Sequence, residues 1–136
     1  MRFSPAAAPD AQPLPSAAPA LLVVDDDRLV RSVVVRVLRL QGYEVLEAGD
    51  AEAALTALGN YPGRVGAVLT DDRMPGMSGR ELAAVVARVY PEVRIVLMSG
   101  ESPHPESEPL SEAVSAVLSK PFSLRGLLET VSWILR

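Results

Sequence analysis

Apolar runs of strand length alternate with amphipathic stretches of helical length along most of the chain. The runs are LLVVD (21–25), YEVLEA (43–48), VGAVLTD (65–71), VRIVLMS (93–99) and AVLS (116–119). Several of them are apolar without interruption, which is typical of strands that are covered on both faces. Since parallel strands are joined by helical crossovers, this order predicts a doubly wound (βα)5 fold, with five parallel strands in one sheet and helices on both faces.

The stretches between the runs carry helix signals. They predict helices over residues 27–42, 50–58, 78–90 and 123–135. Asp27 and Asp50 stand at N-cap positions, and Ser78 with Glu81 has the spacing of a capping box. Gly59 is expected to end the second helix. In the first helix, the face expected to contact the sheet is formed by Val30, Val33, Val34, Val37 and Leu38.

Two proline-rich segments interrupt the pattern. Residues 1–20 contain five prolines, at positions 5, 9, 13, 15 and 19. Prolines at this spacing prevent a helix, so we expect a flexible leader or linker at 1–20 and one domain at 21–136. The segment 101–114 contains prolines at positions 103, 105 and 109. The fourth helix of the alternation is therefore expected to be short or irregular.

Composition excludes several classes of function. The 136 residues suffice for one domain with a substantial core. Thirteen Lys and Arg residues against seventeen Asp and Glu give a net charge of −4, so nucleic acid is not an expected direct partner. No apolar stretch approaches the length of a membrane span, and we expect no membrane contact. The lack of cysteine excludes disulfides, thiol catalysis and zinc–thiolate sites, and it fits a cytoplasmic protein.

Polar side chains stand where four of the predicted strands end. They are Asp25 and Asp26 after the first strand, Asp71 at the third, Ser99 at the fourth and Lys120 after the fifth. In open parallel sheets, ligands bind beyond the carboxyl ends of the strands. Each of these side chains alone has an ordinary structural role, and Asp27 is expected to be only a helix cap. The cluster of three acids, one hydroxyl and one lysine at one edge predicts a shared functional site.

The charges of this cluster favour one kind of chemistry. Three neighbouring carboxylates need a countercharge to stay ionised. Lys120 supplies one positive charge, and Mg²⁺ would supply two more while keeping positions open for phosphate oxygens. A carboxylate beside Mg²⁺ can attack phosphorus and form an acyl phosphate, whose developing charge the metal, the lysine and the hydroxyl can share. The site therefore suits phosphoryl transfer onto an aspartate. His104, the one histidine, is expected to be a solvated surface residue.

The motifs LLVVDDD, TDDRMPGMSG, VLMSG and SKPF, in this order, resemble the receiver domain of two-component response regulators. The resemblance covers residues 21–136 and implies a flavodoxin-like fold. It implies that Asp71 is the phosphoacceptor and a metal ligand. The other implied ligands of Mg²⁺ are Asp25, Asp26 and the backbone carbonyl of Arg73.

The resemblance also assigns the residues around the phosphoryl group. Ser99 matches the hydroxyl residue that hydrogen-bonds this group, and Lys120 matches its charge partner. The Lys120–Pro121 peptide bond is expected to be cis. Asp72 stands where relatives commonly have an apolar residue, so it receives no functional role and is expected at the surface.

The implied phosphoryl donor is a histidine kinase or a histidine phosphotransfer protein, and the implied recipient of the signal is an unknown downstream protein. No separate substrate is turned over, so we expect only self-phosphotransfer onto Asp71 and autodephosphorylation. Two departures from the family concern the output. Val117 stands where an aromatic residue is common, and the segment 101–114 replaces the usual fourth helix.

Two other functions are compatible with the residues. A haloacid-dehalogenase-type phosphatase would use Asp25 and Asp27 as its D-x-D opening, although its second acidic motif and room for a cap are missing. A non-catalytic adaptor with a receiver fold would bind its partner without phosphorylation. The sequence is compatible with a stand-alone receiver and with a receiver module of a larger protein such as a hybrid kinase.

Four arginines fall on the side of the first helix opposite its apolar face: Arg28, Arg31, Arg36 and Arg39. They would steer an acidic partner kinase or phosphotransfer domain if they form a free basic surface. The simpler interpretation is a solvated helix face without a partner.

Overall fold

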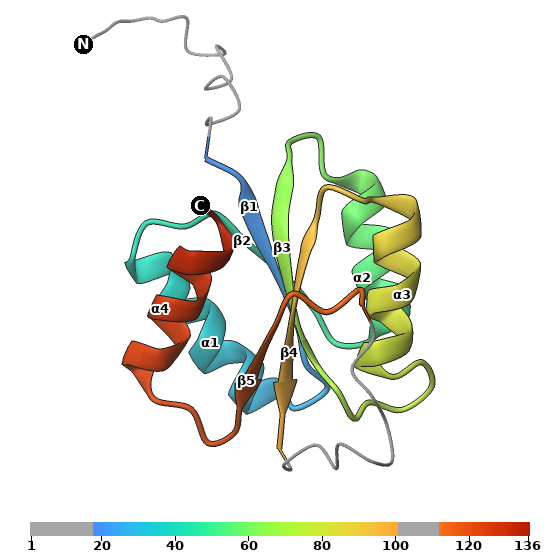
Figure 1. Ribbon diagram of the computed structural model, residues 1–136. Helices are drawn as coiled ribbons and strands as arrows, with labels where there is room; N and C mark the ends of the chain where they lie inside the picture. The colour runs from blue at the N-terminus through green and yellow to red at the C-terminus, as the bar shows by residue number, and fades with distance from the viewer. Residues whose placement is uncertain (1–17, 101–111) are drawn as a thin grey trace, which may run out of the picture.

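A computed structural model describes residues 18–100 and 112–136 of the chain. The strands are β1 (Ala20–Val24), β2 (Val45–Ala48), β3 (Val65–Asp71), β4 (Arg94–Ser99) and β5 (Ala116–Ser119). The helices are α1 (Arg28–Leu40), α2 (Ala51–Asn60), α3 (Gly79–Val89) and α4 (Leu124–Ile134). All strand pairs are parallel, and the order across the sheet is β2-β1-β3-β4-β5 (Figure 1). The predicted doubly wound parallel sheet is confirmed.

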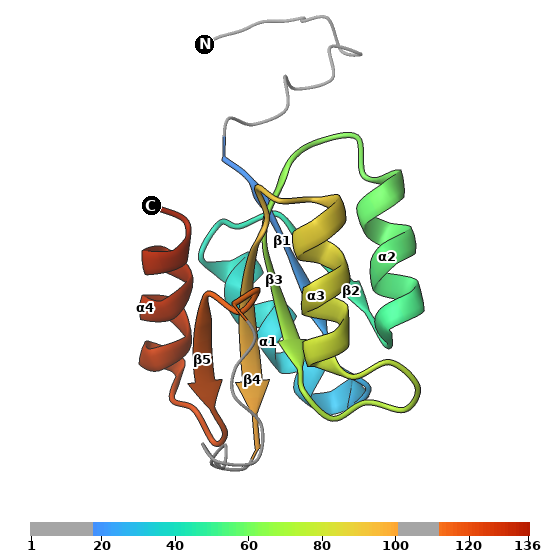
Figure 2. The same cartoon turned by 45° about the vertical axis from the view of Figure 1, so that its right-hand side comes forward.

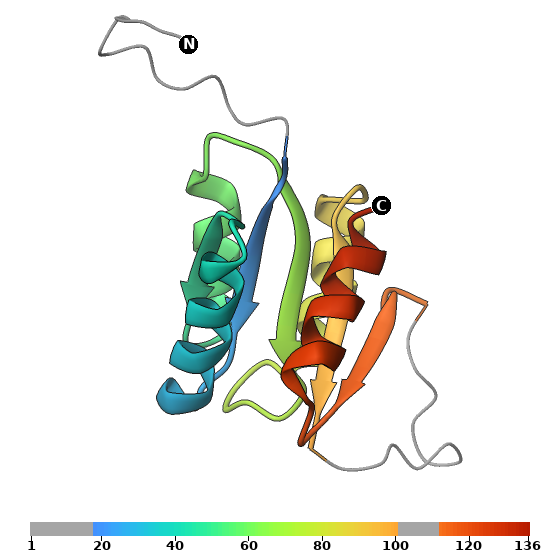
Figure 3. The same ribbon diagram turned by 90° about the vertical axis from the view of Figure 1, so that its left-hand side faces the viewer.

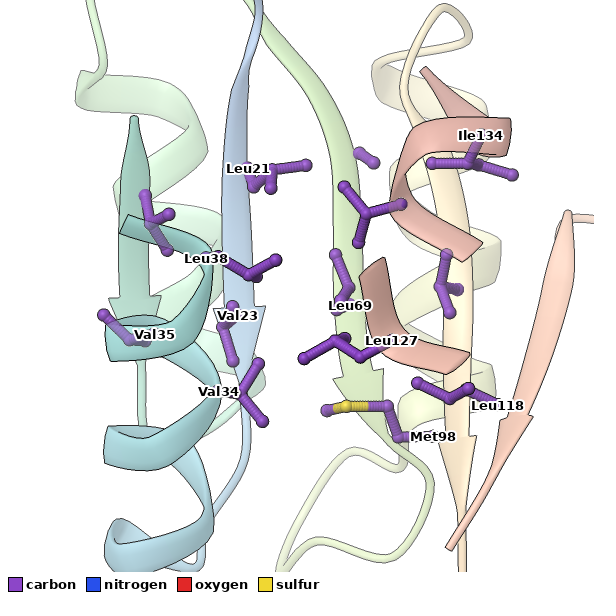
Figure 4. Close-up of a cluster of buried hydrophobic side chains, with 14 residues drawn as sticks. Leu21, Val23, Val34, Val35, Leu38, Leu69, Met98, Leu118, Leu127 and Ile134 are labelled. Carbon is purple, nitrogen blue, oxygen red and sulfur yellow. The ribbon is translucent and has the colours of Figure 1, made fainter. Parts of the chain in front are cut away.

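Helices cover both faces of the sheet. α1 and α4 lie on one face, in front of the sheet in Figure 3, and α2 and α3 lie side by side on the other (Figure 2). The strands are buried because alternate side chains point into two separate cores. The core under α1 and α4, shown in Figure 4, includes Leu21, Val23, Leu38, Leu69, Met98 and Leu127. The core under α2 and α3 includes Leu22, Val24, Leu58, Val68, Leu82 and Ile95.

The predicted helix starts are confirmed by hydrogen bonds. The side chain of Asp27 accepts from the backbone N–H groups of Leu29 and Val30, and that of Asp50 accepts from Ala53. Ser78 and Glu81 form the predicted capping box at the start of α3. These bonds satisfy N–H groups that have no partner within the helix, and each cap contributes about 1 kcal/mol.

Two details of the helix predictions were wrong. Gly59 does not end α2, because the helix continues through Asn60 and its final N–H bond comes from Tyr61 to the carbonyl of Ala57. In α1, Val33 is 56% exposed and Val35 is buried instead. The buried face is thus rotated slightly about the helix axis relative to the predicted one, since it includes Val34, Val35 and Leu38.

The proline-rich segments fall mostly outside the described residues. Of the predicted leader, only residues 18–20 are described, and Ala20 already belongs to β1, one residue before the predicted strand start. The expectation of a short or irregular fourth helix concerns residues 101–114, of which 112–114 are described and form a turn and coil. Ser115 is hydrogen-bonded to β4 just before β5 begins. Its N–H donates to the carbonyl of Ile95, and its hydroxyl accepts from the Ile95 N–H.

Candidate functional site

The register of the strands brings the predicted polar residues to one edge of the sheet. Val24 pairs with Thr70, so Asp25 follows directly beside Asp71. Asp71 pairs with Met98, and Ser99 pairs with Ser119, which places Lys120 next to Ser99. The convergence expected from the strand ends is therefore present, and it follows from backbone pairing alone.

Three carboxylates form the centre of the site. Oxygen atoms of Asp25, Asp26 and Asp71 lie within 4.8 Å of one another. Asp25 is fully buried and Asp71 is 9% exposed, whereas Asp26 is open to solvent. Carboxylate oxygens are the ligands that a hard divalent cation prefers, and Mg²⁺ is held by few protein ligands with water or phosphate in the others. The donor set and its spacing fit such an ion.

Lys120 is the positive side chain of the cluster. Its Nζ lies 3.1 Å from Oδ1 of Asp71 and 3.4 Å from Oδ2 of Asp25, and it donates a hydrogen bond to each. The backbone fixes its position, since the Lys120 N–H donates to the carbonyl of Ser99 over 2.7 Å. The following Lys120–Pro121 peptide bond is cis, as predicted.

The protonation of Asp71 reflects this crowded setting. Burial raises the pKa of the Asp71 carboxyl above its ordinary value, and repulsion from Asp25 and Asp26 adds to the increase, while the hydrogen bond from Lys120 opposes it. Burial alone would lower the pKa of Lys120, but its hydrogen bond to Asp71 and the charges of Asp25 and Asp71 raise it overall. Lys120 therefore stays charged. Ionisation of Asp71 is electrostatically unfavourable in this setting, and a bound cation would make it less so.

The remaining predicted residues lie at the border of the site. Ser99 is buried at the end of β4. Arg73 is exposed and lies two positions beyond Asp71, in the loop between β3 and α3. The structure thus brings Asp25, Asp26, Asp71 and Lys120 into mutual contact or close range. The metal-binding role of the Arg73 carbonyl stays a prediction.

Asp72 was expected at the surface, and the structure shows that it is only partly exposed. Its side chain is only 19% exposed, and its Oδ2 lies 3.2 Å from Nε of Arg80 in the first turn of α3. Asp72 is therefore directed to α3, and its carboxylate is not among the three that converge. The contact with Arg80 was not predicted, because two charges eight residues apart give no sequence signal of contact across a loop.

A close backbone contact fixes the start of α3 against the end of β3. The N–H of Gly79 donates to the carbonyl of Asp72 over 2.9 Å. A Cβ atom added at Gly79 would collide with the backbone carbonyl of Asp71. Only glycine permits this approach, so Gly79 is part of the support of Asp71 although it carries no functional group.

Arg31 was expected on a free helix face, but the structure shows it bound to the site's backbone. Its Nη1 donates to the carbonyl of Asp25 over 2.8 Å, and its Nε lies 3.2 Å from Oε1 of Glu47. Arg39 likewise donates to the carbonyl of Val45 over 2.8 Å. The Arg31 guanidinium is therefore not part of a free basic surface, whereas Arg39 is bound through one nitrogen and remains exposed.

Residues 21–132 match the model of the response regulator receiver domain. The match covers most of the chain and agrees with the fold and with the arrangement of acids and lysine at the carboxyl edge of the sheet. The chain belongs to this family.

Individual relatives agree with this assignment. The chain is 33% identical over 113 residues to the response regulator protein FleR of Pseudomonas aeruginosa, and this match covers 82% of the chain but only 24% of FleR. It is 32% identical over 118 residues to the response regulator receiver protein CpdR of Brucella abortus, covering 85% of the chain and 95% of CpdR. The crystal structure of the response regulator TrrA of Thermotoga maritima in complex with Mg²⁺–BeF is 32% identical, with a TM-score of 0.77 over 86% of this chain and 99% of TrrA.

The phosphatase alternative fits this geometry poorly. Its D-x-D motif would need Asp27 in the site, but the Asp27 carboxylate is occupied by the N–H groups of Leu29 and Val30 at the start of α1. The family match supports the receiver instead.

Among the described helices, none has the length and apolar character required to cross a membrane.

Proposed function

We propose that this receiver domain accepts a phosphoryl group on Asp71 from a histidine kinase or a histidine phosphotransfer protein, with Mg²⁺, and passes the signal on through protein–protein contacts. The observation that carries the proposal is the position of the Asp71 carboxylate. It lies between two further acids and the ammonium group of Lys120, at the edge of the sheet where ligands of such folds bind.

In this proposal an oxygen of the ionised Asp71 forms a P–O bond as the P–N bond of the donor phosphohistidine breaks. The donor ring is protonated on its other nitrogen, so the products are an acyl phosphate and a neutral imidazole. Lys120, already held 3.1 Å from Asp71, would pair with the added negative charge. The buried hydroxyl of Ser99 would donate to a phosphoryl oxygen. Mg²⁺, held by Asp25, Asp26, Asp71 and the carbonyl of Arg73, would neutralise charge on the phosphoryl oxygens.

Two observations support the proposal that the site binds Mg²⁺: the arrangement of the three carboxylates, and the structure of a related protein. The three carboxylates face one another in a partly buried site with one lysine to balance them. TrrA, a protein of the same family, was crystallised in complex with Mg²⁺–BeF. We further propose that the chain turns over no separate substrate and only loses its own phosphoryl group by hydrolysis. The proposal implies a cytoplasmic location, where a kinase has access to ATP.

The experiment is labelling by acetyl phosphate, with Asp71→Asn and Asp72→Asn as a matched pair. The two aspartates are neighbours in sequence, yet only Asp71 belongs to the acid cluster. Mass spectrometry should show Mg²⁺-dependent addition of one phosphoryl group to the native protein and to Asp72→Asn, and none to Asp71→Asn. Label that persists without Asp71 would refute the assignment. A native protein that is unaffected by acetyl phosphate and Mg²⁺ would point to the non-catalytic adaptor.

A further inference from the structure

The two acids after β1 are held in different ways. Every polar atom of Asp25 has a partner. Its N–H donates to the carbonyl of Ala48, its Oδ1 accepts from the N–H of Asp27, its Oδ2 accepts from Lys120, and its carbonyl accepts from Arg31. Asp26 is exposed, and within residues 18–100 and 112–136 no hydrogen bond or ion pair fixes its carboxylate. The direction of the Asp26 side chain therefore depends on the backbone that carries it.

That backbone is held by Arg31. The peptide bond between Asp25 and Asp26 is planar, so a partner that fixes its carbonyl oxygen also fixes the orientation of the plane from which Asp26 projects. The Nη1 of Arg31 donates to this oxygen over 2.8 Å. A hydrogen bond from a charged donor is stronger than one between neutral groups, and the Arg31 side chain is only 18% exposed, which limits competition by water.

Two neighbours hold Arg31 in this pose. Glu47 of β2 accepts a hydrogen bond from the Nε of Arg31 over 3.2 Å. The planar guanidinium is therefore bound through two of its nitrogens, Nε and Nη1. Gly49 leaves space for the group, since a Cβ atom at this position would approach Nη1 to 3.3 Å. Arg31 of α1 thus contacts both β2, through Glu47, and the residue that follows β1, through the carbonyl of Asp25.

We propose that Arg31 is a positioning residue that orients the Asp25–Asp26 peptide for binding the divalent cation. The inference rests on the proposed function, because it concerns the same metal site. Arg31 would not touch the cation or the phosphoryl group. Its effect would be to keep Asp26 aimed at the space between Asp25 and Asp71, so that the ligands need not be ordered when the cation binds.

A purely structural role for Arg31 would be to tie α1 to the sheet, and Arg39 provides the control for it. Arg39 lies toward the other end of the same helix and donates to the backbone carbonyl of Val45, the first residue of β2, over the same distance of 2.8 Å. Arg31→Met and Arg39→Met each remove one arginine–carbonyl bond between α1 and a strand segment, and Arg31→Met also removes the ion pair with Glu47. Only the first bond involves the acid cluster.

The test measures Mg²⁺ affinity by calorimetry on the full chain, together with thermal unfolding. We expect both variants to unfold at a lower temperature, and only Arg31→Met to bind Mg²⁺ more weakly, by about 10–100-fold as for other groups that support metal ligands. Arg31→Lys can reach only one of the two acceptors and should show an intermediate affinity. This variant also keeps the test decisive if Arg31→Met does not fold.

A second readout needs no metal. In the metal-free protein, amide hydrogen exchange of Asp26 and Asp27 should be faster in Arg31→Met than in Arg39→Met at equal overall stability. Equal Mg²⁺ affinity in the two methionine variants would overturn the inference, while native Mg²⁺ binding and labelling of Asp71 would leave the proposed function intact. A native protein that binds no Mg²⁺ would overturn both.

Discussion

Arg80 at the start of α3 contacts Asp72, the residue directly after the phosphoacceptor candidate, with 3.2 Å between Nε and Oδ2. The two side chains are 16% and 19% exposed, so water screens the pair only partly. The two adjacent aspartates thus have different neighbours. Asp71 is directed to the acid cluster, and Asp72 is tied to the helix that follows the loop.

Replacing Arg80 by Gln should therefore destabilise the protein. The substitution leaves the partly buried Asp72 carboxylate without the cation it contacts, and we expect a loss of about 1–3 kcal/mol in the free energy of unfolding. Asp72→Asn should cost less, because the amide can still accept a hydrogen bond from Arg80. Urea unfolding of both single variants and the double variant measures the coupling. Additive effects would mean that the pair contributes nothing to stability.

The raised pKa of Asp71 gives a pH dependence whose sign can be stated. A carboxyl group whose pKa is higher in the folded than in the unfolded state stabilises the fold at low pH, and this contribution is lost as the pH rises from the ordinary value of 3.8 through the folded value. Asp71→Asn resembles the protonated form, so without Mg²⁺ it should raise the unfolding temperature at pH 7 and have little effect well below pH 3.8. Thermal unfolding at both pH values checks this. A variant less stable than the native protein at pH 7 would contradict it.

The pKa of Lys120 is also raised, and the stability that it contributes is likewise lost as the pH rises, but in a more alkaline range. Its pKa is raised above 10.5, so its ion pairs stabilise the fold fully below that pH and are lost only in more alkaline solution. Lys120→Met should therefore destabilise the native protein at neutral pH. In Asp71→Asn the same substitution should cost less, because one of its two carboxylate partners is already neutral. Unfolding at pH 7 of the two single variants and the double variant tests the difference.

The sequence predicted what depends on local pattern and on the topology of the sheet. The strands follow from apolar runs, and the cap at Ser78 with Glu81 follows from spacing within one turn. The meeting of Asp25, Asp71 and Lys120 follows from strand ends in a parallel sheet, since register then places them at the same edge.

The missed features depend on side chains that meet across different elements. Arg31 lies six residues from Asp25 and sixteen from Glu47, and no periodic pattern connects these positions. The error at Val33 and Val35 has a related cause. An apolar run such as VVV fits more than one helix face, and contact with the sheet decides which valines are buried. Such choices are made by tertiary packing, which the sequence pattern does not contain.

Two helical glycines should respond in opposite ways to substitution by alanine. At Gly79 the added Cβ collides with the backbone carbonyl of Asp71, so we expect a loss of about 1–3 kcal/mol in unfolding free energy and weaker phosphoryl labelling. At Gly59 the nearest atom is the hydroxyl of Tyr90 at 3.8 Å, an ordinary contact. Gly59→Ala should stabilise by about 0.4–1 kcal/mol, because the unfolded chain loses freedom, and should leave labelling unchanged. Equal effects at the two sites would show that the contact with Asp71 is unimportant.

The arginines of α1 differ in exposure and in their contacts. Arg31 is largely buried and bound to the carbonyl of Asp25, and Arg39 is exposed but donates to the carbonyl of Val45. Arg28 and Arg36 are exposed and are the pair to test as a partner surface. If an acidic phosphodonor is steered to this helix, Arg28→Glu with Arg36→Glu should slow phosphotransfer by about 10-fold or more at low salt, with a smaller effect at high salt and little loss of stability. Arg88→Glu with Arg94→Glu is the matched control, since these exposed arginines lie toward the opposite edge of the sheet and change the net charge equally. Stopped-flow or quenched transfer from the cognate donor gives the rates. Equal rates in the two double variants would mean that Arg28 and Arg36 form a solvated face without a role in recognition.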